Sequence, residues 1–299
     1  MPACLHPRLL SICQQCYDPP GFDSASIGWT AGDPGPCGSK VDSALVGRVG
    51  DAIVVAYRGT LAPDGPDIRA IIDDWINNAE TLMRPWAPFG DVHDGFLDSH
   101  VALWPKVEQA IAQRIAAAPP RAIIVTGHSK GGALAVIGAT AIRGRFPDIP
   151  VQVVTFAAPR AGGRSFADAY GRQRIPTLRY ENRADLVPYL PLGDTAQPIV
   201  RALLDRLDRL LNRRGLKRRA TGYAAVGNPL IAGPNWAAVT LDWAGVGFRL
   251  FRTRSVRDIG VPLIEAHRID RGVYTQMVAG QVQHCVGQRH AECRAALGE

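Results

Sequence analysis

The chain has 299 residues, of which 46% are hydrophobic and 20% are charged, and this composition predicts a globular protein with a large core. Its net charge of +7 is concentrated in residues 201–219, which hold eight Arg or Lys against two Asp, so the rest of the chain carries about +1. Such a local excess argues against a surface for nucleic acid. No window of eighteen uninterrupted apolar residues occurs, so we expect no transmembrane helix.

The first 17 residues lack a charged segment followed by a long apolar segment, so we expect no secretory signal. We therefore expect a protein that is cytoplasmic, or one that is delivered without a conventional signal peptide. Cys13 and Cys16 have the spacing of a redox or zinc site. Four residues near the C-terminus carry side chains that would complete such a site: His284, Cys285, His290 and Cys293. We favour packed, reduced thiols on terminal helices, with no metal and no other cofactor.

Strands and helices alternate along the first two thirds of the chain. Residues 45–57 predict two strands joined by a turn at Gly50-Asp51, and residues 101–117 have the periodicity of a helix. Residues 151–156 and 177–182 are typical of buried strands. This order predicts an α/β fold, with a mostly parallel sheet and helices on both faces.

Between a predicted strand at residues 121–126 and a predicted helix at 132–146 lies Gly-His-Ser-Lys-Gly, a match to the Gly-x-Ser-x-Gly nucleophile elbow. A turn this tight leaves no space for a Cβ atom at Gly127 or Gly131. Ser129 is therefore the candidate nucleophile, and the backbone N–H of Lys130 is a candidate oxyanion donor at the helix N-terminus.

A serine nucleophile needs a base and a carboxylate that orients the base. Of the three histidines downstream, His267 has the loop position expected of a base, whereas His284 and His290 fall in a terminal segment, residues 262–297, that predicts a helix. Asp185 directly follows the strand at 177–182, and Asp194 is the alternative carboxylate.

Strands and helices no longer alternate between residues 192 and 262, where we expect an irregular insert with one amphipathic helix. Its basic face predicts peripheral contact with an anionic membrane, although a surface helix with solvated arginines explains the same pattern.

Several motifs, in this order, resemble the class 3 (fungal-lipase-like) lipase family: Tyr57-Arg58-Gly59-Thr60, Asp74-Trp75, His93-Asp94-Gly95-Phe96, the elbow continued by Gly132-Ala133-Leu134-Ala135, Thr155-Phe156-Ala157-Ala158-Pro159-Arg160, Asn182-Arg183-Ala184-Asp185-Leu186-Val187-Pro188 and His267. The resemblance implies a single α/β-hydrolase domain over residues 1–299, with a lid at 61–74 and the insert at 192–262. It also implies a triad of Ser129, Asp185 and His267, with Thr60 as the second oxyanion donor beside Lys130. His93, His128 and Arg160 match family positions, and we expect packing or hydrogen-bonding roles for them. The segment from Tyr223 to Gly227 resembles a strand that these lipases carry before their histidine.

Two features depart from the family pattern. Lys130 stands where an apolar residue is usual, so we expect its side chain to meet an acidic group of the substrate or to be solvated. The segment at 61–74 is also longer than the usual lid, which predicts altered interfacial activation.

These observations predict a serine hydrolase that cleaves carboxylic ester bonds of lipids through an acyl-enzyme. One alternative is a catalytically silent hydrolase-fold protein that binds anionic membranes. Another is an antibacterial phospholipase delivered to a neighbouring cell.

Overall fold

The computed structural model describes residues 5–17, 27–30, 32–38, 42–60, 83–182, 185, 187–191, 222–232, 267, 269 and 273–287. The expected lid at 61–74, the alternative carboxylate Asp194 and the basic helix around 201–219 lie outside these residues. So do the histidine at position 290 and the cysteine at 293.

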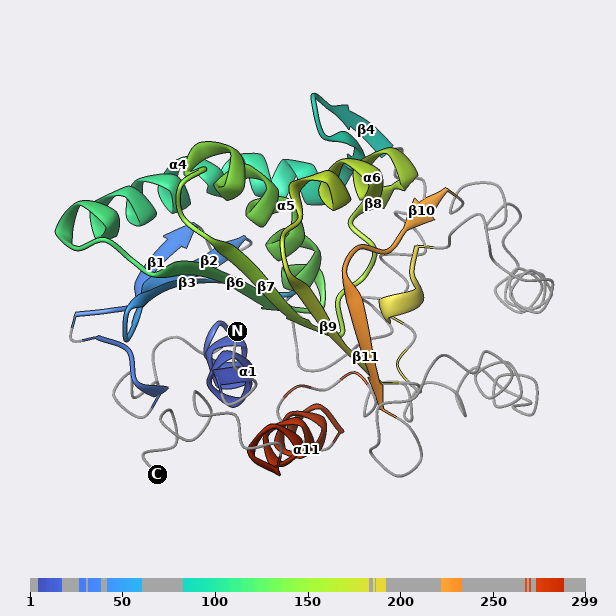
Figure 1. Ribbon diagram of the computed structural model, residues 1–299. Coiled ribbons are helices and arrows are strands. Elements are labelled where there is room, and N and C mark those ends of the chain that lie inside the picture. The colour runs from blue at the N-terminus through green and yellow to red at the C-terminus, as the bar shows by residue number, and fades with distance from the viewer. Residues whose placement is uncertain are drawn as a thin grey trace.

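A seven-stranded sheet forms the centre of the protein (Figure 1), and its spatial order is β1-β2-β3-β6-β7-β9-β11. The strands are β1 (Gly35–Gly38), β2 (Ser43–Val49), β3 (Ala52–Tyr57), β6 (Ala122–His128), β7 (Val151–Phe156), β9 (Thr177–Asn182) and β11 (Asn228–Ala232). β1, β2 and β3 pair antiparallel, and every pair from β3 to β11 is parallel. The carboxyl ends of five strands therefore meet at one edge, where active-site loops gather in α/β sheets.

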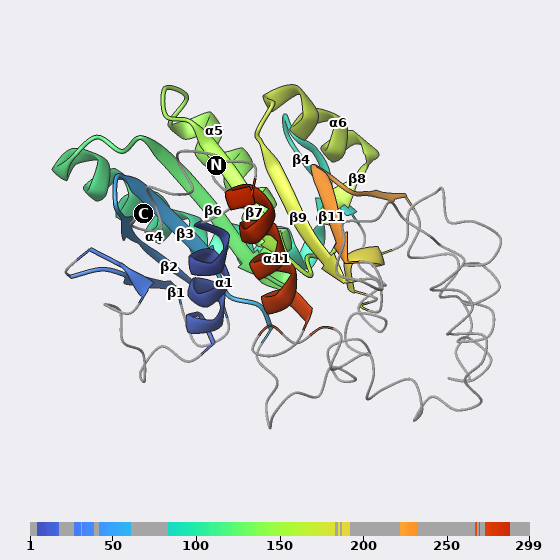
Figure 2. The same ribbon diagram turned by 60° about the horizontal axis from the view of Figure 1, so that its bottom comes forward.

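Helices cover both faces of this sheet, as expected from the alternation of elements. α4 (Asp94–Ala117), α5 (Lys130–Arg145) and α6 (Arg164–Gln173) lie on one face. α1 (His6–Gln15) and α11 (Val273–Gly287) lie side by side on the other, although they come from opposite ends of the chain (Figure 2). Among the described residues, no helix is both long and apolar enough to cross a membrane.

Alternation along β3 divides its side chains between two apolar layers. Ile53, Val55 and Tyr57 join the cluster under α4 and α5, whereas Val54 and Ala56 join the cluster under α1 and α11. Since successive side chains of a strand point to opposite faces, a strand buried on both sides needs an unbroken apolar run. The sequence Ala-Ile-Val-Val-Ala-Tyr meets that need.

A second, four-stranded sheet has the order β10-β8-β5-β4 and was not predicted. Its strands are β4 (Met83–Trp86), β5 (Gly90–His93), β8 (Gly162–Gly163) and β10 (Tyr223–Ala224). Between residues 192 and 262 we expected an irregular insert with one helix. The described part of this range has two strands, β10 and β11, and β11 extends the main sheet. The segment from Tyr223 to Gly227 thus forms only a two-residue strand, and the longer strand follows it.

Local predictions agree closely with the elements of the central sheet. The hairpin at Gly50-Asp51 joins β2 to β3, and the strands at 121–126, 151–156 and 177–182 correspond to β6, β7 and β9. α4 begins at Asp94 rather than at residue 101, because the His93 side chain accepts a hydrogen bond from the backbone N–H of Phe96 and caps the helix.

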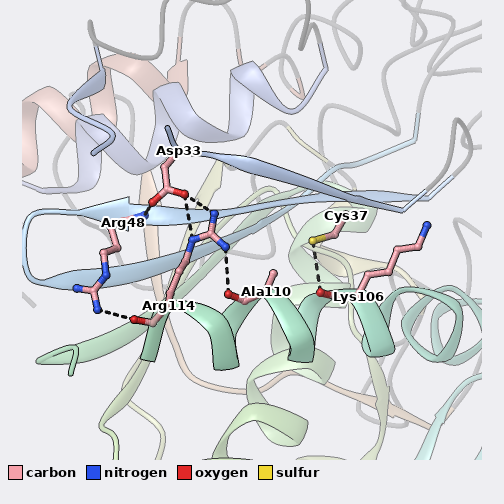
Figure 3. Close-up of polar contacts among 6 residues, drawn as sticks. All are labelled: Asp33, Cys37, Arg48, Lys106, Ala110 and Arg114. Carbon is pink, nitrogen blue, oxygen red and sulfur yellow. Dashed lines mark hydrogen bonds and ion pairs between the residues drawn. The ribbon is translucent and has the colours of Figure 1, made fainter. Parts of the chain in front are cut away.

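A group of polar contacts fastens α4 to the antiparallel edge of the sheet (Figure 3). Asp33 accepts hydrogen bonds from the backbone N–H of Arg48, at 2.7 Å, and from the Arg114 guanidinium, at 3.1 Å from Nε. Arg48 in turn donates to the carbonyl oxygen of Arg114, and Cys37 donates to that of Lys106. The contacts of Asp33, Arg48 and Arg114 lie at the end of the sheet opposite the carboxyl ends of the parallel strands, since Arg48 is in register with the second residue of β3. Cys37 is in register with Ala44, which pairs with the last residue of β3, so its contact lies at the other end.

Candidate active site

Ser129 lies between the end of β6 and the start of α5, in a backbone conformation with φ 56° and ψ −132°. It occupies the N-cap of α5, where a serine hydroxyl ordinarily bonds to the free backbone N–H groups of the first turn. Here the side chain makes no such bond. The hydroxyl of a buried serine is thus kept free of helix capping.

The two elbow glycines are required by close backbone packing. A Cβ atom at Gly127 would collide with the carbonyl oxygen of Gly131, as expected from the tightness of the turn. A Cβ at Gly131 would collide instead with the carbonyl oxygen of Tyr57, at the end of β3. The start of α5 therefore packs directly on the backbone of the neighbouring strand.

Asp185 and His267 are brought together although 82 positions separate them. His267 Nδ1 lies 2.8 Å from Asp185 Oδ2, and both side chains are almost completely buried. The other carboxylate oxygen, Oδ1, accepts a hydrogen bond from the backbone N–H of Val187 at 3.0 Å. Asp185 can only accept when ionised, so His267 carries its proton on Nδ1, and Nε2 of the neutral ring is left as a base.

Tyr274, on the first turn of α11, is a further partner of Asp185 that the sequence did not suggest. Its hydroxyl donates to Asp185 Oδ2 at 2.7 Å and accepts from the backbone N–H of Asn182 at 3.2 Å. Burial, followed by the charge of Asp185, raises the pKa of Tyr274 well above its usual value. The phenol therefore stays protonated and remains a donor to the carboxylate.

Two atoms at the centre of the site have no hydrogen-bond partner among the described residues: Ser129 Oγ and His267 Nε2. Both are buried, and a polar atom left unpaired in that environment costs about 1 to 3 kcal/mol. Active sites are among the places where a fold retains such atoms. A triad is the arrangement that would join these two.

The loop after β3 lies against the elbow. Tyr57 is in register with Gly127, so the segment that runs on to Thr60 begins at the carboxyl edge of the sheet next to the elbow. A Cβ at Gly59 would come within 2.8 Å of the carbonyl oxygen of His128. Thr60 and the N-terminal N–H of Lys130 thus lie on the two segments that flank Ser129, which is where oxyanion donors are needed.

The Lys130 side chain has a different environment from the two that we expected. Its Nζ forms an ion pair with Asp42 Oδ1 at 2.9 Å, and both side chains are about four-fifths buried. The cation is therefore neutralised within the fold, rather than solvated or offered to an acidic group of a substrate.

His128 and Arg160 have the hydrogen-bonding roles that we expected of them. His128 Nε2 lies 2.9 Å from the carbonyl oxygen of His267. Arg160 donates from its backbone N–H to Leu190 O and from Nη1 to Pro191 O, and so ties the loop after β7 to the segment that follows Asp185.

A second buried carboxylate, Glu181, lies near the end of β9. Burial raises its pKa, while the charges of Arg179 and Arg160 oppose the rise. Arg179 Nη1 is 2.5 Å from Glu181 Oε1, so this carboxylate is already paired. It is Asp185, rather than Glu181, that contacts an imidazole.

Cys13 and Cys16 are buried free thiols on the N-terminal helix and its C-cap. Cys13 Sγ lies 3.3 Å from Thr126 Oγ1, and Cys16 donates to the carbonyl oxygen of Ala56. Burial raises the pKa of Cys13 to about 12, so its thiol is protonated and unreactive near neutral pH. Within the described parts of the chain, no three His, Cys, Asp or Glu side chains cluster as metal ligands would.

The tyrosines of the site left little signal in the sequence. Tyr274 follows His267 by about two helical turns, which is a weak clue that both belong to one docked segment. Tyr17 lies at the other end of the chain, yet its hydroxyl is 2.8 Å from Nδ1 of His128. No local pattern indicates a contact between residues 111 positions apart.

Comparisons with known proteins agree with this geometry. Residues 54–195 match the family model of lipase (class 3). The chain is 33% identical over 159 residues to secreted mono- and diacylglycerol lipase 3 of Gibberella zeae, a match that covers 50% of this chain and 46% of that protein. It is 26% identical over 229 residues to phospholipase A(1) DAD1, chloroplastic, of Arabidopsis thaliana, which covers 69% and 48%. The match thus spans less than half the length of each of these relatives.

The structure also resembles solved lipases. The triacylglyceride lipase of Rhizomucor miehei superposes with a TM-score of 0.59 at 20% identity, over 87% of this chain and 95% of that one. At this identity the likeness establishes the fold. Together with the sequence match it shows that the chain has the α/β-hydrolase fold and that its residues 54–195 are those of a class 3 lipase.

Proposed function

We propose that the protein is a serine hydrolase that cleaves carboxylic ester bonds of lipids. The observation that carries this proposal is the buried hydrogen bond between His267 Nδ1 and Asp185 Oδ2, 2.8 Å long, which leaves Nε2 of the ring unpaired. Ser129 on its strained elbow supplies a second unpaired atom of the kind that such a base would activate.

In the proposed reaction, Ser129 Oγ attacks the acyl carbonyl carbon while His267 Nε2 takes the hydroxyl proton. Negative charge moves to the carbonyl oxygen, which accepts hydrogen bonds from the N–H groups of Lys130 and Thr60. The intermediate collapses, the ester C–O bond breaks, and the departing alkoxide takes the proton from His267. Water then repeats the sequence on the acyl-enzyme, releasing the fatty acid and regenerating Ser129.

Asp185 stabilises the imidazolium that forms in each half-reaction, and it keeps the ring in the tautomer that presents Nε2. Tyr274 supports this role, since its hydroxyl shares Oδ2 with His267 and so restricts rotation of the carboxylate. The buried environment strengthens both hydrogen bonds, because little water competes for the charged oxygen.

The names of the relatives support glycerolipids as the substrate class. They are a mono- and diacylglycerol lipase, a phospholipase A(1) and a triacylglyceride lipase, which differ in head group and share fatty-acyl esters of glycerol. We propose the same ester bond as the target here. Such substrates lie in lipid surfaces, so the proposal includes transient contact with a membrane or droplet.

The test is hydrolysis of a short p-nitrophenyl ester, together with a panel of mono-, di- and triacylglycerols and phospholipids. Ser129→Ala should lower kcat about 10⁴-fold to 10⁶-fold, because removing the nucleophile of a triad has an effect of that size. Labelling by a fluorophosphonate should disappear in the same variant. Equal turnover by wild type and Ser129→Ala would contradict the assignment.

The labelling experiment also separates an enzyme from a silent membrane-binding protein. A folded wild-type protein that binds liposomes, but neither reacts with the fluorophosphonate nor hydrolyses any ester, would favour the silent alternative.

A further inference from the structure

Tyr17 makes contact with two loops of the active site, although it lies just beyond the N-terminal helix. Its hydroxyl is 2.8 Å from His128 Nδ1 and receives a backbone hydrogen bond from Gly59. The approach to Gly59 is so close that a Cβ atom there would collide with the hydroxyl oxygen. Tyr17 thus touches the residue before the candidate nucleophile and the residue before Thr60.

His128 continues this chain of hydrogen bonds to the base. Its Nε2 lies 2.9 Å from the carbonyl oxygen of His267, which can only accept, so Nε2 carries the proton. In a neutral imidazole Nδ1 is then the acceptor, and the Tyr17 hydroxyl is its donor. These hydrogen bonds all run in one direction. Gly59 N–H donates to the Tyr17 hydroxyl, Tyr17 donates to His128, and His128 donates to the backbone carbonyl of His267.

We propose that Tyr17 and His128 are positioning residues for the base, an inference that rests on the proposed function. The side chain of His267 is held from one end by Asp185, at Nδ1. The His128 contact holds its backbone. With only the first contact, the ring is free to pivot about Nδ1 and move Nε2 relative to Ser129. With both, two points fix the imidazole.

The N-terminal helix holds the same segment at another point, which supports this role. Gln14, on α1, donates from Nε2 to the carbonyl oxygen of Ile269 at 2.8 Å. α1 therefore contacts the segment around the base directly through Gln14 and indirectly through Tyr17 and His128. The three loops of the proposed site are those with Thr60, Ser129 and His267. All three are thus contacted, directly or through His128, by the same short part of the chain, residues 14–17.

Tyr17→Phe tests the proposal because it removes only the hydroxyl. We expect kcat on a p-nitrophenyl ester to fall roughly tenfold while KM changes less than twofold, since misplaced catalytic groups slow the chemical step rather than substrate binding. The rate of fluorophosphonate labelling should fall in parallel.

The chain offers a matched control in Tyr180→Phe. The Tyr180 hydroxyl lies 2.7 Å from Nδ1 of His6, so it also joins α1 to the sheet through a tyrosine–histidine hydrogen bond. Among the described residues, this bond involves neither Gly59, the elbow nor His267. Its loss should lower the melting temperature about as much as Tyr17→Phe does, with kcat unchanged. A merely structural role of Tyr17 predicts the same kcat for both variants.

Two substitutions of His128 identify which contact matters. Gln places an amide N–H near the position of Nε2, so His128→Gln keeps a donor for His267. Asn reaches only the position of Nδ1, so His128→Asn keeps the contact with Tyr17 alone. His128→Gln loses the bond from Tyr17, so we expect kcat to fall roughly tenfold, as in Tyr17→Phe. His128→Asn loses the bond to His267 itself, so we expect a larger fall, about a hundredfold.

These outcomes decide the proposal separately from the proposed function. An inactive, unlabelled wild type contradicts the hydrolase assignment itself. An active wild type with equal kcat in Tyr17→Phe and Tyr180→Phe overturns the positioning role, as does a KM that rises in step with the loss of kcat. If Tyr17→Phe does not fold, the two His128 variants decide, and equal kcat in both overturns the proposal.

Discussion

Ser129 occupies a helix N-cap without capping the helix, in a backbone region that only glycine adopts easily. Strain of this kind costs about 1 to 3 kcal/mol, and the absent cap about 1 kcal/mol more. The fold therefore gives up stability at the residue from which the hydroxyl must project.

Ser129→Gly should raise the free energy of unfolding by about 1 kcal/mol, because relief of the strain exceeds the extra chain entropy of glycine. Ser129→Ala is the matched control, since it also removes the nucleophile but retains the strained Cβ. Urea denaturation of the two inactive variants measures the difference. Identical midpoints would show that the elbow is not strained.

At this scale the sequence predicted backbone geometry well and side-chain partners poorly. The elbow has a local requirement, two glycines around a serine, and that requirement is visible in five consecutive residues. The partner of Lys130 is Asp42, 88 positions away, and nothing near either residue indicates the ion pair. Asp185 and His267 were identified from their positions after expected elements, but their contact follows from how the whole sheet places them.

At the scale of elements, α4 depends on the group of contacts around Asp33. Both carboxylate oxygens of this residue are used, one by the Arg48 backbone and one by the Arg114 guanidinium. The Asp33 and Arg114 side chains are 13% and 15% exposed, so water competes weakly for them. The contacts join the antiparallel edge of the sheet to the last turns of the helix.

Asp33→Asn should therefore lower the free energy of unfolding by about 2 kcal/mol, since it leaves a largely buried guanidinium without its counter-charge. Asp98→Asn is the comparison, because it removes an ion pair with Arg84 whose side chains are 45% and 64% exposed. That change should cost about 0.5 kcal/mol or less. Chemical denaturation gives both values, and kcat should be unchanged in each. Equal losses would mean that the Asp33 contacts behave as a surface ion pair.

Elements with strong periodicity were predicted, and those without it were missed. β3, β6 and β7 are apolar runs buried on both sides, and their composition indicates strands. β8 has two glycines and β4 contains a proline, so neither looks like a strand in isolation. They form strands because neighbouring segments supply their hydrogen-bonding partners, which is information that a local pattern does not contain.

At the scale of the whole molecule, three of the described histidines are kept neutral: His6 and His100 are buried, and His93 is half-buried. Burial lowers the pKa of His6, His93 and His100 to about 4 in each case, from an ordinary value of 6.5. Above pH 6.5 these residues are neutral in both the folded and the unfolded chain. As the pH falls toward 4, the unfolded chain takes up protons that the fold does not, so stability is lost over that range.

His100→Phe should reduce the stability that the protein loses as the pH falls. His100 is 3% exposed and its ring contacts those of Trp86 and Trp104, with Nδ1 unpaired among the described residues. Between pH 7.5 and pH 5 the variant should lose about 2 kcal/mol less stability than wild type. Urea denaturation at the two pH values tests this. Parallel losses in the two proteins would show that His100 titrates normally in the fold.

The overall architecture followed from the alternation of strands and helices, because parallel strands require crossovers and thus a covered sheet. What it did not indicate is that the first and last described helices, α1 and α11, are neighbours. That pairing brings Tyr17 and Tyr274 to the same site from opposite ends of the chain. The pairing depends on long-range packing. The apolar faces of α1 and α11 indicate only that each helix is buried against something, not that they are buried side by side.

The side-by-side placement of α1 and α11 also bears on protein synthesis. A nascent chain that has emerged as far as α6 already contains the elbow and the oxyanion loop, but it lacks Asp185, His267 and the helix that carries Tyr274. Its serine has no base. The proposed chemistry therefore begins only after the segment with His267 has been made and α11 has docked beside α1.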